Sequence, residues 1–332
     1  MKKNILVIMM IMLLLVGCSS PQESSEQVNG ETSKTKIGIV QIVEHPSLDA
    51  ARQGFLDVLS ENGYKEGENL VVDYKNAQGD MPTLNTIAQN LVAGDNDLIL
   101  AIATPSAQAV ANATKNNKIP VLFTAVTDPV AAGVVKSLEK TETNLTGTID
   151  MAPIKEQIEL IKEIDPNVKN LGVLYNTSEV NSVVQVDLVK EAAEDIGINI
   201  VEAVATNSSE VDQAARSLVG KVDAIYIPTD NTVVSAVEAV VKVALDNKIL
   251  LVSAEKDSVV RGTVATIGLD YYKLGRQTGE MALKILKQGT NPQDMPVESQ
   301  KEKSIIINVK AAEALGITIP ETVLEKAQEI IK

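Results

Sequence analysis

Short apolar runs alternate with segments of helical spacing from residue 36 to residue 308. The runs are rich in Val, Ile and Leu and have the length of strands. We expect strands at 36–43, 70–74, 97–102, 119–124, 170–175, 199–204, 223–227, 249–253, 264–268 and 303–308. We expect helices at 47–62, 82–93, 105–115, 154–164, 180–196, 232–246 and 271–288. This alternation predicts an α/β fold of parallel βαβ units, because right-handed crossovers place helices on both faces of a sheet.

The composition supports this fold and excludes one class of partner. The 332 residues include 2 Phe, 6 Tyr and no Trp, so the core must be built from aliphatic side chains. Aliphatic cores suit parallel strands that are buried on both faces, and the lack of rings does not suit a surface that stacks nucleobases. The formal net charge is -14, and such a field repels phosphate. We therefore expect no nucleic acid partner.

The chain lacks the common signatures of metal and enzyme sites. It has 1 His and 1 Cys, which excludes zinc fingers, thiolate clusters and structural disulfides, so we expect no metal and no cofactor. No Gly-x-Gly-x-x-Gly follows a predicted strand, and no P-loop or Gly-x-Ser-x-Gly elbow occurs. Hydrolysis by paired carboxylates stays open, because acidic residues are plentiful. The sequence otherwise predicts a protein that is not an enzyme.

The N-terminus has the pattern of a bacterial lipoprotein signal. Lys2 and Lys3 precede the apolar run 5–16, which is too short to span about 30 Å of hydrocarbon. The run ends just before Cys18, as in a lipobox, so we expect a signal peptide at 1–17 and lipidation of Cys18; the alternative is a buried cysteine after an export signal. Residues 18–35 are polar and predict a flexible tether. The protein is then expected outside the cytoplasm, anchored to the cell membrane by lipid.

Two halves of the chain resemble each other. Residues 97–106 align with 223–232, and the short segments at 36 and 117 align with those at 170 and 247. Such matches can reflect the common pattern of βα units, but they favour two similar α/β lobes. In open α/β sheets ligands bind beyond the carboxyl ends of the strands, near helix N-termini. We therefore expect a cleft that both lobes share.

The loops after the predicted strands carry small hydroxyl, amide and acidic side chains. The candidate ligand-binding residues are His45, Thr104, Pro105, Ser106, Thr127, Asp128, Tyr175, Asn176, Asp230, Asn231, Glu255 and Asp270. Helix capping is the alternative role for residues of this kind, and Thr104 and Asp230 have good capping positions. For His45 the alternative is a loop histidine with its hydrogen bonds satisfied.

The same loops carry a family resemblance. The matching stretches are 37–46, Phe123–Pro129, Gly172–Asn176, Tyr226–Thr232 and Asp270–Gly279. From Ile37 to about Lys332 the sequence resembles the bacterial ABC-transporter substrate-binding lipoproteins of the tryptophan/aromatic amino-acid type. This family is similar to type I periplasmic binding proteins, which have two Rossmann-like lobes, three crossovers and a closing cleft.

The resemblance implies a domain organisation and partners. The first lobe would comprise 36–147 plus 270–296 and the second 148–269 plus 297–332, with crossovers near 147–150, 268–270 and 296–302. The protein would act as a monomer and deliver its ligand to an ABC permease with its ATPase. A sensing lipoprotein that docks on a membrane receptor, or one that binds a different solute, has the same fold and stays an alternative. A DNA-binding repressor is disfavoured by the export signal and by the lack of an N-terminal helix-turn-helix.

An amino-acid ligand also fits the chemistry of the loops. Its carboxylate needs donors, which the helix start at Thr104, Pro105 and Ser106 supplies. Its ammonium needs an acidic partner, for which Asp128, Asp230 and Asp270 are the candidates. An aromatic side chain would lie against apolar walls that include Tyr175 or His45. The choice among tryptophan, phenylalanine and tyrosine stays open.

Overall fold

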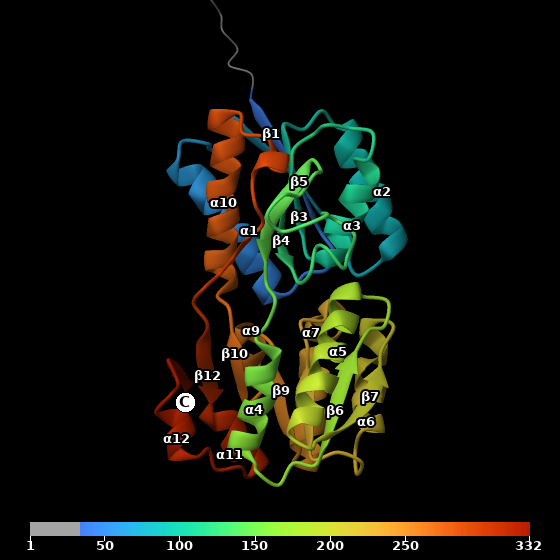
Figure 1. Cartoon of the computed structure of the whole chain (residues 1–332), viewed down its shortest axis with the longest axis vertical. Helices are drawn as coiled ribbons and strands as arrows, with labels where there is room; N and C mark the ends of the chain where they lie inside the picture. The colour runs from blue at the N-terminus through green and yellow to red at the C-terminus, as the bar shows by residue number, and fades with distance from the viewer. Residues whose placement is uncertain (1–33) are drawn as a thin grey trace, which may run out of the picture. The chain divides into compact units, whose positions relative to one another are not determined.

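The computed structural model describes residues 34–332, which form two parallel-sheet α/β lobes (Figure 1). The expected signal peptide, Cys18 and nearly all of the expected tether lie outside the described residues. The predicted fold class is confirmed. No helix between residues 34 and 332 combines the length and the hydropathy that crossing a bilayer requires.

The sheet of the first lobe has six parallel strands in the order β11-β5-β4-β3-β1-β2. Its strands are β1 (Thr35–Gln41), β2 (Leu70–Asn76), β3 (Leu98–Ile102), β4 (Val121–Val126), β5 (Leu145–Ile149) and β11 (Glu298–Ser299). Its helices are α1 (Pro46–Glu61), α2 (Met81–Ala93), α3 (Thr104–Ala113) and α10 (Tyr271–Gln288), with a 3-10 turn at Pro292–Asp294. The central strands β3 and β4 are buried along their whole length, as helices on both faces require.

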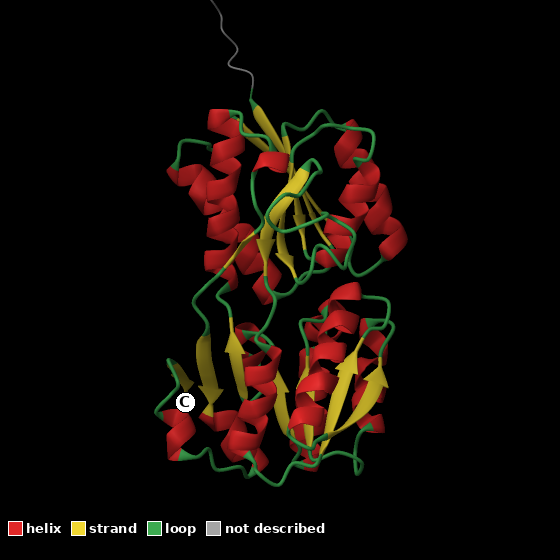
Figure 2. Ribbon diagram, in the orientation of Figure 1, coloured by secondary structure: helices red, strands yellow, loops and turns green. Residues whose placement is uncertain are grey.

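The sheet of the second lobe has seven strands in the order β13-β12-β10-β9-β8-β6-β7. Its strands are β6 (Asn170–Tyr175), β7 (Asn199–Val204), β8 (Ala224–Ile227), β9 (Leu250–Ser253), β10 (Ala265–Gly268), β12 (Ser304–Asn308) and β13 (Glu329–Ile331). Its helices are α4 (Ile154–Ile164), α5 (Val180–Asp195), α6 (Val211–Ser217), α7 (Asn231–Ser235), α8 (Val237–Asn247), α9 (Lys256–Val260), α11 (Val309–Leu315) and α12 (Glu321–Leu324), with a 3-10 turn at Ser208–Glu210. Figure 2 shows that β12 runs antiparallel to β10.

The chain passes between the sheets at three places: between β5 and α4, between β10 and α10, and between β11 and β12. Two of these crossovers differ slightly from the expected lobe boundaries. Residues 148–149 pair with β4 and β11, and 298–299 pair with β5, so both pairs belong to the first sheet and not to the second lobe. The reason is that β5 continues its parallel ladder to Ile149 before the chain turns.

The sequence-based expectation lacks β5, β11 and β13 and the short helices α6, α9, α11 and α12, and one helix that it does contain is divided. Strand β5 was not expected, because Thr146, Gly147 and Thr148 interrupt its apolar pattern; a Cβ on Gly147 would overlap the carbonyl oxygen of Phe123 on β4. The helix expected at 232–246 is two helices, α7 and α8, separated at Ala236.

Helices α1 and α10 pack closely against each other on one face of the first sheet, while α2 and α3 pair on the other (Figure 1). Two glycines permit the approach of α1 to α10. A Cβ on Gly54 would overlap the carbonyl oxygen of Tyr272, and a Cβ on Gly275 would overlap that of Ala51. This packing matters for function, because α1 and α10 both begin at the carboxyl edge of the sheet.

Candidate functional site

The carboxyl edges of the two sheets enclose a cavity whose walls come from both lobes. Its lining is polar and acidic, with a few apolar side chains. The lining residues are His45, Leu48, Thr104, Ala125, Thr127, Asp150, Asn181, Thr229, Asp230, Asn231, Val234, Glu255 and Tyr271. The space open to the centre of a water molecule is about 20 Å³, enough for about one water. The lobes are therefore closed over the site.

A second space adjoins this cavity and shares Asn231 with it. It has about 190 Å³ of such space and is lined by Ile42, Val43, Gln78, Gly79, Met81, Pro105, Asn176, Ser178, Glu179, Thr206, Asn207, Ser208, Asn231, Thr232 and Ser235. Ile42, Met81 and Pro105 contribute apolar atoms to the wall of this groove. The cleft thus has a small cavity and a roomier adjoining groove, and both have polar and apolar side chains on their walls.

Two side-chain hydrogen bonds join the lobes directly. The Ser47 hydroxyl, in the first turn of α1, donates to Glu255 Oε2 at 2.6 Å, and both residues are buried. The hydroxyl oxygens of Thr127 and Thr229 are 3.4 Å apart. Both contacts join residues of different lobes, so separation of the lobes would break them.

Glu255 is the N-cap of the short helix α9. Its carboxylate accepts from the backbone N–H groups of Asp257 and Ser258, both at 2.7 Å, from the Ser258 hydroxyl and from Ser47. Burial raises the pKa of Glu255, and the hydrogen bonds from Ser258 and Ser47 partly offset the rise.

Asp230 is fully buried at the end of β8 and caps α7. Oδ1 accepts from the Val233 N–H at 2.8 Å. Oδ2 accepts from the Asn176 N–H and the Ser182 hydroxyl, both at 2.6 Å. Burial, with the charge of Glu179 second, raises the pKa of Asp230 to about 7. The side chain therefore ties the end of β8 to the end of β6.

Asp150 and Tyr271 link two of the crossovers. Asp150 follows β5 at the first crossover, and Tyr271 is the first residue of α10 after the second. The Tyr271 hydroxyl donates to Asp150 Oδ2 at 2.7 Å, and the Thr127 hydroxyl donates to Oδ1 at 3.1 Å. Burial raises the pKa of Asp150, against the opposite effect of these two hydrogen bonds.

Several buried polar atoms of the cleft have no hydrogen-bond partner. Among the described residues these are His45 Nδ1, Ser106 Oγ and Asn181 Oδ1, besides the Tyr74 hydroxyl elsewhere in the first lobe. His45 and Asn181 line the cavity, and Ser106 lies in the first turn of α3. An unpaired buried polar atom is costly and is expected where a ligand supplies the missing partner.

The structure brings together many of the predicted site residues. His45, Thr104, Thr127, Asp230, Asn231 and Glu255 line the cavity, Pro105 and Asn176 line the adjoining groove, and Ser106 is buried beside them on α3. His45 precedes α1, and its pKa is lowered to about 3 by burial and by the positive charge of Arg261. A neutral imidazole therefore faces the cavity.

Besides Ser106, three predicted residues line neither space. Asp128 accepts from the N–H groups of Val130 and Ala131 in its own loop, at 3.0 and 2.9 Å. The Tyr175 hydroxyl donates to Glu202 at 2.5 Å, toward the edge strand β7. Asp270 caps α10 through the Lys273 N–H at 3.0 Å. These side chains therefore form hydrogen bonds within their own loop or helix or with a neighbouring strand.

The cleft residues that sequence reasoning missed include Asp150, Glu179, Asn181, Thr229 and Tyr271. Glu179 accepts from the side chains of Asn181, Asn231 and Thr232 and so organises one wall. For Asp150 a signal was available, because it stands at an expected crossover. Asn181 and Tyr271 lie inside expected helices, where nothing in the pattern distinguishes them.

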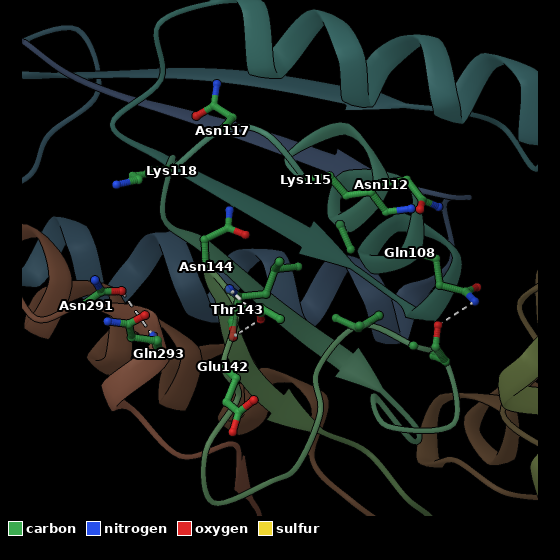
Figure 3. A pocket seen from close by; sticks show the side chains of 15 residues that line it. Gln108, Asn112, Lys115, Asn117, Lys118, Glu142, Thr143, Asn144, Asn291 and Gln293 are labelled. Atoms are coloured by element: carbon green, nitrogen blue, oxygen red, sulfur yellow. Dashed lines mark hydrogen bonds between the residues drawn. The ribbon is translucent and has the colours of Figure 1, made fainter.

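A larger cavity lies elsewhere, on the first lobe. Figure 3 shows its lining, which includes Gln108, Lys115, Lys118, Asn144 and Gln293. Lys118 and Asn144 precede β4 and β5, so this cavity lies at the amino ends of those strands, opposite to the edge where parallel sheets bind ligands. Between residues 34 and 332, no group of three or more His, Cys, Asp or Glu side chains is placed to hold a metal ion.

Two α/β lobes joined by three crossovers, with a closed polar cavity between their carboxyl edges, define a two-lobed solute-binding protein of the type I periplasmic kind. Residues 36–331 match the family of ABC transporter substrate binding proteins, and the chain belongs to this family. It is consequently a solute binder and not an enzyme, as the sequence predicted. This excludes the alternative of hydrolysis by paired carboxylates. ABC substrate-binding proteins act outside the cytoplasm, and this part of the predicted location is confirmed.

Relatives with known names or structures support the assignment. The chain is 48% identical to the tyrosine-binding protein of Clostridioides difficile strain R20291, over 92% of this chain and 88% of that protein. The crystal structure of a Streptococcus pneumonia ABC domain in complex with L-Trp is 41% identical, with a TM-score of 0.86 over 90% of this chain and 100% of that one. The ligand-free, open structure of a Clostridium difficile substrate binding protein with adhesive properties is 50% identical, with a TM-score of 0.66 over 90% of this chain and 99% of that one.

These two structures bear on the arrangement of the lobes. The open structure has the higher identity to this chain but the lower TM-score, whereas the L-Trp complex superposes well. The arrangement of residues 34–332 therefore resembles that of the L-Trp complex. The cross-lobe hydrogen bonds and the small cavity agree with this closed arrangement.

Proposed function

We propose that this protein captures an aromatic L-amino acid between its lobes and delivers it to an ABC permease with its ATPase. The observation that carries the proposal is the closed cavity, which is acidic and has unpartnered polar atoms on its wall. The two relatives whose names mention tyrosine and L-Trp support the aromatic class. L-tryptophan and L-tyrosine are accordingly the first ligands to test.

The cleft offers a distinct place for each part of such a ligand. The acidic cavity suits the ammonium, and the start of α3 suits the carboxylate, because Ser106 Oγ and the helix N-terminus supply donors. The aromatic ring would lie against Leu48, Val234 and the Tyr271 ring, and extend toward the groove beside Met81. An amino acid enters only after the lobes separate, because the closed cavity holds about one water.

Titration calorimetry of residues 34–332 with each of the twenty amino acids tests this proposal. We expect one aromatic L-amino acid to bind per chain, with the D-enantiomer of the same amino acid as the control. Because the chain has no Trp, indole fluorescence reports bound L-tryptophan against a weak tyrosine background. Failure of tryptophan, tyrosine and phenylalanine to bind would contradict the proposal.

We propose further that the protein is a monomer anchored by lipid at Cys18, with 1–17 removed as a signal peptide. The positive start, the apolar run 5–16 and the lone cysteine support this. Cys18→Ala should abolish incorporation of a labelled fatty acid and release the protein from the membrane or leave it unprocessed. Ligand affinity should stay unchanged, because the cleft begins beyond the tether. Label retained by the variant would argue against the anchor.

A further inference from the structure

We infer that Asp150 is the group that binds the ligand ammonium, and that Asp230 and Glu255 hold the walls of the cleft in place. This assignment rests on the proposed function in that it takes an amino acid as the ligand. It makes the first crossover, between β5 and α4, part of the binding site.

The cavity has acidic groups on its wall and no cationic side chain. Three carboxylates, those of Asp150, Asp230 and Glu255, contribute to its wall, and no Lys or Arg does. All three side chains are buried. A buried carboxylate without a positive partner is unfavourable, so the arrangement favours a ligand that carries its own cation.

Two of these carboxylates already have most or all of their acceptor positions filled by the protein. A carboxylate has about four acceptor positions. Glu255 uses them for Ser47, the Asp257 N–H and both donors of Ser258. Asp230 has three donors, two of which are backbone N–H groups that cannot turn away. An ammonium would have to compete with these bonds.

Asp150 differs from both. Its two oxygens each accept one bond, from the hydroxyls of Thr127 and Tyr271, and no backbone N–H of another residue is bonded to it. Each oxygen therefore keeps a free lone pair. Two atoms on the wall of the same cavity also lack partners, Asn181 Oδ1 and His45 Nδ1. Asn181 Oδ1 is an acceptor, so it can share an ammonium that has three N–H donors.

The position of Asp150 would couple ligand binding to the hinge. Its bond to Tyr271 connects the first and second crossovers, and Gln300 of the third crossover bonds to the backbone of Asp270 beside Tyr271. An ammonium bound to Asp150 would lie beside these hydrogen bonds, which connect the three crossovers about which the lobes move relative to each other. The positive charge of the ligand would thus act at the crossovers, where the two lobes are connected.

The test compares Asp150→Asn with Asp128→Asn in residues 34–332, using calorimetry with L-tryptophan, L-tyrosine and their deaminated propionate analogues. Asp128 is the matched control, because it is an acid of a strand-end loop that lines neither space. We expect the wild type and Asp128→Asn to prefer the amino acid over the deaminated analogue by roughly 30-fold or more. In Asp150→Asn the affinity for the amino acid should fall by a similar factor and the preference should disappear.

A measurement on the wild type guards against misfolding of the variant. Carbon-13 NMR of the side-chain carboxyls should show the pKa of Asp150 fall when the amino acid binds, because an adjacent ammonium favours the charged form. Normal affinity and preference in Asp150→Asn would overturn the inference, as would an Asp150 pKa that does not fall. Loss of the preference in Asp230→Asn alone would assign the role to Asp230. Binding of a non-aromatic amino acid that depends on Asp150 would support the inference and contradict the proposed aromatic ligand.

Discussion

At the scale of single residues, the lone histidine shows how burial changes the pKa of a side chain. His45 stands at the N-cap of α1 without a side-chain capping bond, 7% exposed, on the wall of the cavity. Its pKa is lowered to about 3 by burial and by Arg261, against about 6.5 in an unfolded chain. The folded protein therefore keeps His45 neutral where the unfolded chain takes up a proton.

The sign of the pH effect follows from this difference. The contribution of neutral His45 to stability is fully present above pH 6.5 and falls as the pH drops toward 3. Between pH 7.5 and 5.5 the free energy of unfolding of the wild type should fall by about 1.4 kcal/mol relative to His45→Gln. Urea unfolding of both proteins at both pH values measures this difference. Asp150, Asp230 and Glu255 are present in both proteins, so their own contributions to the pH dependence cancel in the comparison. Parallel pH profiles would show that His45 is exposed or protonated in the folded protein.

The residue scale also shows what sequence could and could not predict about the site. The loops after the predicted strands lie at the carboxyl edges of the sheets, as expected, so His45 and Thr104 could be placed in the cleft. The direction of an acidic side chain depends on which N–H groups lie nearest, and these are fixed only by the folded loop. Asp128 turns to the N–H groups after Pro129, while Asp150, at a crossover, faces Tyr271 from a distant helix. The order of residues in the sequence does not show which of the two carboxylates turns to its own loop and which faces the cleft.

At the scale of elements, the contact of α1 with α10 positions both ends of the site. Helix α1 carries His45 and Ser47 at its start, and α10 begins with Tyr271. Because Gly54 and Gly275 let the two backbones touch, the helices cannot shift independently. A change at this contact should therefore affect stability and the cleft together.

Gly275→Ala tests this. A Cβ at residue 275 would overlap the Ala51 carbonyl oxygen, and such overpacking costs about 1–3 kcal/mol or more. We expect the thermal midpoint to fall and ligand affinity to weaken, because α1 and α10 must separate. Glu280→Ala on the exposed side of α10 is the control and should change stability by less than about 0.5 kcal/mol. A stable Gly275→Ala would mean that the helices do not meet backbone to backbone.

Element prediction from sequence succeeded where periodicity was strong and failed where packing decides. The strands buried on both faces, such as β3 and β4, are almost entirely apolar runs, and the sequence predicts them. Strand β5 was missed because its centre is Thr146, Gly147 and Thr148, and only its contact with Phe123 explains the glycine. The division of one expected helix into α7 and α8 likewise has no marker in the apolar spacing.

At the scale of the whole described chain, binding depends on the free-energy difference between open and closed lobes. A ligand shifts this equilibrium only through contacts that differ between the two states. The Ser47–Glu255 and Thr127–Thr229 hydrogen bonds belong to the closed state alone, because each joins one lobe to the other. The bonds of Glu255 within the second lobe, to Asp257 and Ser258, are present in both states.

Ser47→Ala should therefore weaken ligand binding while leaving each lobe folded. A buried hydrogen bond to a charged group contributes about 1.5–3 kcal/mol, so affinity should fall about 10-fold or more. Small-angle scattering should show the variant contracting only at correspondingly higher ligand concentration. Ser258→Ala is the matched control, because it removes a hydroxyl from the same carboxylate within one lobe: it should lower the stability of the second lobe without shifting the contraction. If Ser47→Ala contracts at the wild-type concentration, the closed state is held by the ligand and the crossovers, and the Ser47–Glu255 bond only accompanies closure.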